Sequence, residues 1–325
     1  MAFDKIRSSQ PMVVKLLENS IKNDRLSHAY LFEGERGTRK FKTAVYFAQM
    51  LLCKGEQKPC EICHNCRRIK HHTHPNLSII EPIKGSIRKK QIVDLQTEFS
   101  KTSVEPGPKI YIIKDIETIN VGAANSLLKF LEEPHPNVHA VLTTSNISRI
   151  LPTIISRSQV VQFSSFSKEL IEEELVEMGF PILTSKLVSR LTNSVSDAVE
   201  IANGDFFIDL VDLVKEIYKL LAGKESVIIY FNQNSSIIYQ DKEISNLFLS
   251  ILITYQKDLI NHKIEHFSKV VFEDELSNIA TISRDKTKNR LIEELEEMLA
   301  LKARIDSYIN ERLAYDNLLL SLERR

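Results

Sequence analysis

The segment from His28 to Thr43, HAYLFEGERGTRKFKT, constrains the fold more than any other part of this sequence. Its apolar start predicts a strand over Ala29–Phe32, and Lys40 is expected to open a helix. Between them, Gly34 and Gly37 predict a tight turn. A strand, a glycine turn and a helix in this order form the loops that hold phosphate groups on backbone N–H donors. The segment therefore predicts an α/β domain that contains a phosphate-binding loop.

Two features of a working phosphate site are altered. The glycine expected just before the lysine is Arg39, and the hydroxyl residue that should ligate Mg²⁺ is Phe41. The strand expected to end in an acidic metal ligand, Ile110–Ile113, is followed instead by Lys114, with Asp115 one place later. Because both motifs lack the residue expected to ligate Mg²⁺, the site is predicted not to use ATP productively. A chance turn that happens to carry a lysine is the alternative explanation of the loop.

The sequence after this loop alternates apolar strands with helices. Such an alternation is typical of a parallel sheet covered by helices on both faces. We therefore expect an α/β domain over residues 1–165. Its further strands are expected at Leu77–Ile80, Ile110–Ile113, Ala140–Thr144 and Val160–Phe163, and helices near Ser86–Ser100 and Gly122–Glu132.

The remainder of the chain has helical patterns. Three short helices predict a small second domain over residues 166–205. All prolines lie at or before Pro181 and all glycines at or before Gly223, so residues 224–325 are expected to be mostly uninterrupted helix. We therefore expect an all-α bundle over residues 206–325. Its apolar stripes either close on each other or form a subunit interface.

The four cysteines of the chain are clustered in an expected insertion over residues 53–74. Their spacing, C-x6-C-x2-C-x2-C, would bring four thiolates around one tetrahedral ion. A closed four-cysteine zinc site has no open position for water, so it would stabilise the insertion and not catalyse a reaction. Free buried thiols are the alternative. The predicted zinc ligands are Cys53, Cys60, Cys63 and Cys66.

Histidines and basic residues fill much of the same insertion. Cys60–His64 also matches the attachment pattern of haem c, but that linkage belongs to exported proteins. The histidines could replace a cysteine ligand, yet beside several cations they are expected to form a solvated basic face that could touch nucleic acid. The whole chain has 43 basic and 43 acidic residues, so such contact would depend on a local patch. The residues of this face are Arg67, Arg68, Lys70, His71, His72 and His74.

The sequence predicts a cytoplasmic protein without a membrane partner. Its start, MAFDKIRSSQ, lacks the apolar region of a signal peptide. The most apolar run, Leu247–Tyr255, is too short to span a bilayer.

A possible catalytic arginine lies between the loop Pro152–Ile154 and the last expected strand, in Ser156-Arg157-Ser158. An arginine in this place can pair with a surface carboxylate. It can also act as an arginine finger, which stabilises charge on a γ-phosphate and raises the rate of hydrolysis by about 10³ to 10⁵. Spacing alone favours the ion pair and leaves the finger open.

Four motifs occur in order along the chain, in a match that spans residues 1 to about 205. They are HAYLFEG-x-RG, the cysteine insertion, AANSLLKFLEEP over residues 123–134, and LPTIISRS over residues 151–158. Together they resemble the bacterial clamp-loader subunits of DNA polymerase III. In that family an AAA+ module is followed by a three-helix lid and an α-helical collar that joins the subunits in a ring. The resemblance implies an AAA+ domain over residues 1–165, a lid over 166–205 and a collar over 206–325.

The family contains ATP-hydrolysing motor subunits, gamma or tau, and a non-hydrolysing delta-prime branch that acts as a rigid stator. Arg39, Phe41 and Lys114 depart from the motor pattern, and Ser196 stands where motor subunits place an arginine before an Asp-Ala pair. The sequence is therefore similar to the delta-prime branch. This implies a component of the polymerase holoenzyme that is not an enzyme by itself, with structural zinc and no productive ATP binding. The degenerate loop residues are Gly34, Gly37 and Lys40.

The serine-arginine-cysteine trio of the family corresponds here to Ser156, Arg157 and Ser158. The resemblance therefore favours a finger at Arg157 that acts on ATP in a neighbouring subunit. The implied partners are the gamma/tau and delta subunits, the sliding clamp and primed template DNA. Two other functions stay open. One is a gamma- or tau-type motor with a degenerate loop. The other is a free-standing zinc protein that binds DNA through Arg67, Arg68 and Lys70.

Overall fold

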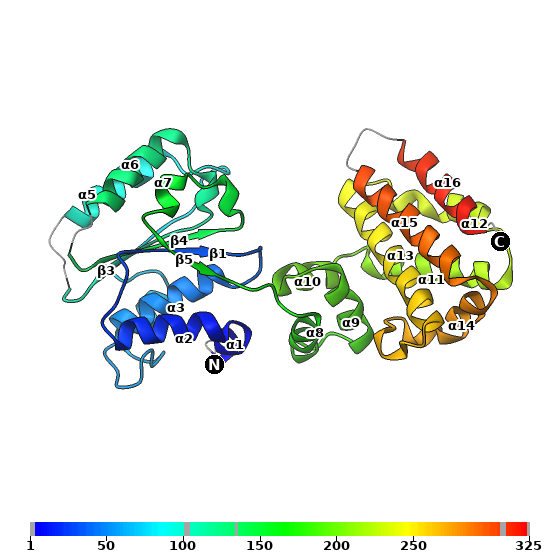
Figure 1. Ribbon diagram of the computed structural model, residues 1–325, viewed down its shortest axis with the longest axis horizontal. Helices are drawn as coiled ribbons and strands as arrows, with labels where there is room; N and C mark the ends of the chain where they lie inside the picture. The colour runs from blue at the N-terminus through cyan, green and yellow to red at the C-terminus, as the bar shows by residue number, and fades with distance from the viewer. Residues whose placement is uncertain (1–3, 101–104, 134–135, 306–309, 324–325) are drawn as a thin grey trace. The chain divides into compact units, whose positions relative to one another are not determined.

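A computed structural model of the chain describes residues 4–100, 105–133, 136–305 and 310–323. It divides the chain into two compact units, residues 1–166 and 167–325. The first unit contains a β-sheet with helices on both sides, and the described part of the second is helical (Figure 1). Within the described ranges, no helix is both long and apolar enough to cross a membrane.

Five parallel strands form the sheet of the first unit, in the spatial order β2-β3-β4-β1-β5. Along β1, Tyr30 and Phe32 pack into one core cluster, whereas Ala29 and Leu31 pack into the other. A central strand that is buried on both faces needs apolar residues at successive positions, which explains its unbroken apolar sequence. The strands are β1 (Ala29–Glu33), β2 (Leu77–Ile80), β3 (Lys109–Ile113), β4 (Val138–Thr144) and β5 (Gln159–Gln162).

Helices cover both faces of this sheet, which confirms the predicted α/β class. One core cluster joins the strands to α1, α2, α3 and α4, and the other joins them to α5, α6 and α7. Two short 3₁₀ helices follow β3 and β4. The elements are α1 (Asp4–Ser9), α2 (Pro11–Lys22), α3 (Lys40–Leu52), α4 (His64–Lys70), α5 (Lys89–Ser100), η1 (Ile116–Thr118), α6 (Val121–Glu132), η2 (Ile147–Arg149) and α7 (Pro152–Ile155).

The predicted strands and helices of this unit lie where the structure has them, with no end shifted by more than three residues. The main addition is α4, which sequence periodicity does not predict. Its seven residues place Ile69 in the core, and the Cys63 side chain caps its first turn by accepting a hydrogen bond from the Cys66 N–H. Pro134, the last residue of the AANSLLKFLEEP motif, lies outside the described residues.

The second unit begins with three short helices, as the sequence predicts, and continues as a helical bundle. The short helices are α8 (Lys168–Glu177), α9 (Ile182–Leu191) and α10 (Val195–Ala202). The bundle helices are α11 (Phe207–Gly223), α12 (Val227–Asn234), α13 (Lys242–Lys263), α14 (Leu276–Asp285), α15 (Lys288–Arg304) and α16 (Glu311–Glu323), with η3 (Ser235–Ile237), η4 (Phe267–Lys269) and η5 (Glu273–Glu275) between them.

The chain after residue 224 is more interrupted than its lack of proline and glycine predicts. Lys224 follows α11 and Glu265 follows α13, with left-handed φ values of 59° and 60°. The side chains of Asp241 and Thr287 accept hydrogen bonds at the starts of α13 and α15. The described residues after 224 are therefore mostly helical, as predicted, but they form separate helices, so the expectation of an uninterrupted helix is wrong.

A segment between α13 and α14, residues 264–275, forms ion pairs both with the short helices and with the bundle. Lys186 of α9 forms an ion pair with Glu273. Lys215 of α11 pairs with Asp274 at 2.5 Å. The short helices and the bundle therefore pack as one compact unit. A boundary between the second and third predicted domains stays a prediction.

Candidate functional site

The loop between β1 and α3 has the backbone form of a phosphate-binding turn. Gly34 lies against the chain after β5, since a Cβ added to it would meet the backbone oxygen of Phe163 at 2.7 Å. Gly37 has a φ of 81°, a conformation that glycine favours. Lys40 begins α3. The predicted order of strand, turn and helix is therefore present.

The Lys40 side chain is directed into this loop and is only 8% exposed. Its ammonium donates to the backbone oxygens of Gly34 and Glu35, the latter at 2.6 Å, and lies 3.4 Å from Thr38 Oγ1. Burial lowers the pKa of Lys40, and the negative charge of Glu117 partly opposes this effect. A phosphate group entering the loop would have to compete with the carbonyl oxygens of the loop itself.

Arg39 replaces the expected glycine and keeps a glycine-like backbone. Its φ is 64°, in the left-handed region that costs a non-glycine residue about 1–2 kcal/mol. Its guanidinium donates to the backbone oxygen of Lys5 at 2.6 Å and to Ser9 Oγ at 3.0 Å. The guanidinium carbon also lies 5.0 Å from the centroid of the Phe166 ring. These contacts hold the side chain on α1 and on the chain after β5.

An aromatic ring and an ammonium occupy the region expected to handle the metal. Lys114 Nζ lies 5.4 Å from the centroid of the Phe41 ring, within the range of a cation–π contact. The Phe41 ring also contacts the His72 ring in a T-shaped arrangement, with the two ring centroids 5.7 Å apart. Lys114 Nζ also lies 3.5 Å from a carboxylate oxygen of Glu81. Mg²⁺ coordinates oxygen atoms, and neither the Phe41 ring nor the Lys114 ammonium supplies one.

Glu117 is a carboxylate beside this loop that the sequence analysis did not identify. It accepts hydrogen bonds from the backbone N–H of Ser145 at 3.0 Å and from its hydroxyl at 2.6 Å. Burial alone would raise the pKa of Glu117, but these hydrogen bonds outweigh burial and lower it. Its position shortly after β3, two residues beyond Asp115, is the sequence signal that could have found it.

Arg157 follows α7, and neighbours in the same unit hold its guanidinium. Nη2 lies 2.8 Å from Glu132 Oε1, while Nη1 donates to the backbone oxygen of Thr153 at 3.0 Å and to Ser156 Oγ at 3.5 Å. The hydroxyl of Ser158 donates instead to a backbone oxygen of α7. The surface ion pair anticipated from the sequence is therefore present in the single chain, with the Arg157 side chain still 35% exposed.

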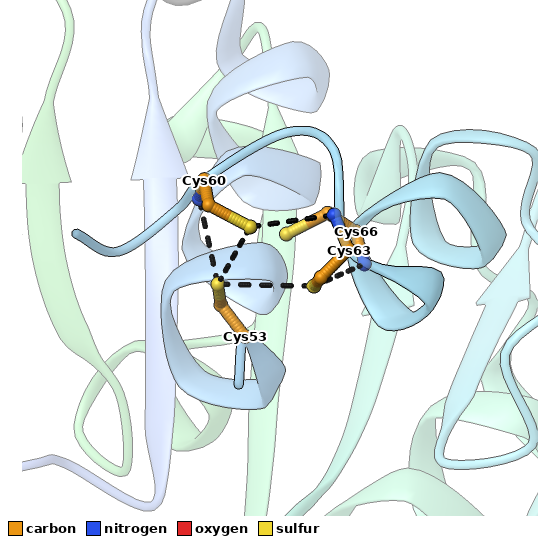
Figure 2. A group of neighbouring side chains, drawn as sticks. All are labelled: Cys53, Cys60, Cys63 and Cys66. Atoms are coloured by element: carbon orange, nitrogen blue, oxygen red, sulfur yellow. Dashed lines mark hydrogen bonds between the residues drawn. The ribbon is translucent and has the colours of Figure 1, made fainter. Parts of the chain in front are cut away.

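The four cysteine thiols converge between the end of α3 and the start of α4 (Figure 2). Their sulfur atoms all lie within 4.8 Å of one another. Cys53 Sγ is 3.5 Å from Cys60 Sγ and 4.0 Å from Cys63 Sγ. A tetrahedral zinc ion with Zn–S bonds of about 2.3 Å needs sulfur atoms about 3.8 Å apart. The cluster of Cys53, Cys60, Cys63 and Cys66 could therefore bind a metal ion such as zinc.

Backbone N–H groups surround this sulfur cluster. Gly55 and Cys60 donate to Cys53 Sγ at 3.3 and 3.4 Å. Cys63 donates to Cys60 Sγ, and Cys66 to Cys63 Sγ, each at 3.4 Å. The N–H of Cys63 lowers the pKa of the Cys60 thiol. A Cβ at Gly55 would meet Cys60 Cβ at 2.9 Å, so this glycine lets the six-residue gap close around the sulfurs.

The histidines of the insertion do not join the sulfur cluster found in the described part of the chain. His74 is buried apart from it, with Nδ1 accepting a backbone hydrogen bond at 3.1 Å. Arg68 pairs with Glu105 at 2.7 Å. Arg67 and Lys70 are exposed, so the predicted basic face offers two cations to solvent and has Arg68 tied to a carboxylate.

Comparison with known proteins decides the family. A sequence model described as "DNA polymerase III, delta subunit" matches residues 9–167. DNA polymerase III subunit delta' of Bacillus subtilis (strain 168) is 36% identical over 325 residues, which cover 99% of this chain and 99% of the relative. This chain belongs to the delta-prime family of DNA polymerase III subunits. The delta-prime subunit is a component of the clamp loader, and its parallel sheet with flanking helices has the α/β class that the sequence predicts.

Tau and gamma subunits are also similar to this chain. Subunit tau of Bacillus subtilis is 32% identical over 166 residues, which cover 50% of this chain and 29% of tau. A solved structure, the gamma subunit-related protein of Thermotoga maritima, aligns over 95% of this chain and 99% of its own. The sequence identity is 18% and the TM-score is 0.43, values that by themselves assign no function.

The predicted site residues of this delta-prime chain fall into three groups. The loop residues gather around Lys40, the four cysteines gather in the insertion, and Arg157 lies with Ser156 beside α6. The contact between Phe41 and His72 connects the first two groups. The named contacts of Arg157 come from α6, α7 and Ser156 and not from the loop.

Proposed function

We propose that this delta-prime subunit does not hydrolyse ATP and acts as a stator that helps open the sliding clamp and place it on primed template DNA. The contact between Phe41 and Lys114 carries this proposal, because it puts a ring and a cation where Mg²⁺ would need oxygen ligands. The inward direction of Lys40 supports the same conclusion, since its ammonium is already bonded to the carbonyls of the loop.

We propose that Arg157 acts on ATP held by a neighbouring gamma or tau subunit. A chain without productive ATP binding has no use for a finger in its own loop, and the contacts of Arg157 lie away from that loop. Its partial exposure supports access by another subunit. A guanidinium can donate to two phosphate oxygens at once, which suits a γ-phosphate that gains charge in the transition state.

The proposed partners are the gamma/tau and delta subunits, the sliding clamp and primed DNA. Exposed apolar side chains support subunit contact through the collar: Leu313 and Leu320 lie seven residues apart on one face of α16 and are 58% and 44% exposed. Lys89 and Lys90, exposed at the start of α5, supply positive charge that suits DNA phosphates.

We propose that the four cysteines hold structural zinc. The sulfur spacings support a tetrahedral site, and four protein ligands leave no position for a reacting water molecule. Zinc would then fix the insertion, whose His72 contacts Phe41 of the loop helix.

The isolated chain should show no ATP turnover above the level of its Lys40→Ala variant. Without oxygen ligands from residues 41 and 114, Mg²⁺ cannot be held against the β- and γ-phosphates. The measurement is steady-state phosphate release with Mg²⁺ and ATP, and a gamma or tau subunit in the same assay serves as the positive control. Steady turnover that disappears in Lys40→Ala would contradict the proposal and favour the motor function.

A further inference from the structure

The carboxylate of Glu132, the last residue of α6, contacts the guanidinium of Arg157, which follows α7. The two helices belong to the layer on one face of the sheet (Figure 1). Nη2 of Arg157 lies 2.8 Å from Glu132 Oε1, and Nη1 lies 3.0 Å from the backbone oxygen of Thr153. Two nitrogen atoms of one planar group thus meet acceptors on two elements, which fixes the orientation of the plane.

This ion pair is poorly placed to stabilise the fold. The side chains of Arg157 and Glu132 are 35% and 48% exposed, and pairs this accessible to water are weak. A carboxylate in the last turn of a helix also faces the negative end of the helix dipole. Stability therefore does not account for a glutamate at this position.

We propose that Glu132 is a positioning residue for Arg157, an inference that rests on the proposed action of Arg157 on ATP in a neighbouring subunit. A free arginine side chain samples many rotamers, and holding it in one orientation beforehand removes an entropic cost from the reaction. A guanidinium has five N–H donors, and the contacts with Glu132 and Thr153 engage only part of them. The carboxylate thus orients the finger and leaves donors for phosphate oxygens.

The test uses the complete clamp loader assembled with Glu132→Gln, which keeps the shape of the side chain and removes its charge. We expect kcat for clamp- and DNA-stimulated ATP hydrolysis at the adjacent site to fall about two- to fivefold. The KM for ATP should change less, because the finger acts on the transition state. The Tm of the isolated chain should not fall. Glu133→Gln, the same change at the next exposed residue, is the matched control and should leave kcat unchanged.

A double variant separates positioning from other effects. Glu132→Gln combined with Arg157→Ala should be no slower than Arg157→Ala alone, because there is then no guanidinium to position. A wild-type rate for Glu132→Gln beside a slow Arg157→Ala complex would overturn the positioning role and leave the proposed role of Arg157 intact. A faster Glu132→Gln complex would also overturn it, since Glu132 would then restrain the finger. A wild-type rate for Arg157→Ala would overturn both proposals.

Discussion

Clamp loaders assembled with Arg157→Lys should hydrolyse ATP almost as slowly as those assembled with Arg157→Ala. Lysine keeps the positive charge but lacks the planar fork that reaches two phosphate oxygens. We expect both variants to assemble normally and to lose about 10-fold or more of the stimulated rate at the adjacent site. The total rate falls less, because other motor sites continue to work. Steady-state ATPase and clamp-loading assays measure the effect.

The control for this experiment is Arg149→Lys. Arg149 is an exposed arginine of η2 in the same unit, and its replacement should leave both assays unchanged. If fully assembled Arg157→Lys and Arg157→Ala complexes hydrolysed ATP and loaded clamps at wild-type rates, Arg157 would be no more than the surface partner of Glu132.

Protein purified without a chelator should contain one zinc ion per chain, and Cys60→Ser should lose it. Removing one thiolate opens the tetrahedral site, and structural zinc contributes about 10–16 kcal/mol of binding free energy to small folded modules. We therefore expect the insertion to unfold locally in this variant, while the sheet, which has its own core clusters, stays folded. Elemental analysis measures the metal, and X-ray absorption should give Zn–S distances of about 2.3 Å.

His71→Ala is the matched control for the zinc site. His71 is exposed in the same insertion and does not belong to the sulfur cluster, so its variant should keep one zinc ion. Wild-type protein that contains no metal, or Cys60→Ser protein that keeps a full complement, would show that the thiols are not zinc ligands.

The sheet and the sulfur cluster were predictable because each rests on a local pattern. A strand buried on both faces needs an apolar run, so Ala29–Phe32 and Ile110–Ile113 stood out in the sequence. The cysteines were recognisable because short spacings keep thiols within reach of one ion, and the structure brings the predicted four together.

Other features depend on contacts that no local pattern encodes. The pairing of Arg157 with Glu132 joins the turn after α7 to the end of α6, so the sequence could suggest a carboxylate partner without identifying it. The helix α4 has one apolar residue in the core, Ile69, and therefore no periodicity to detect. Lys224 and Glu265 hold the left-handed positions after α11 and α13, where a glycine is the usual residue.

The cation–π contact between Lys114 and Phe41 also affects how this chain can change over evolutionary time. A hydroxyl residue at position 41 alone would remove the ring beneath the ammonium, and an acidic residue at 114 alone would leave Mg²⁺ without the hydroxyl ligand. Each single step toward a working ATP site thus loses an existing contact before the metal can bind. Under the proposed function, restoring Mg²⁺ binding would need changes at positions 41 and 114 and also at Arg39, so no single substitution would recover an ATP site.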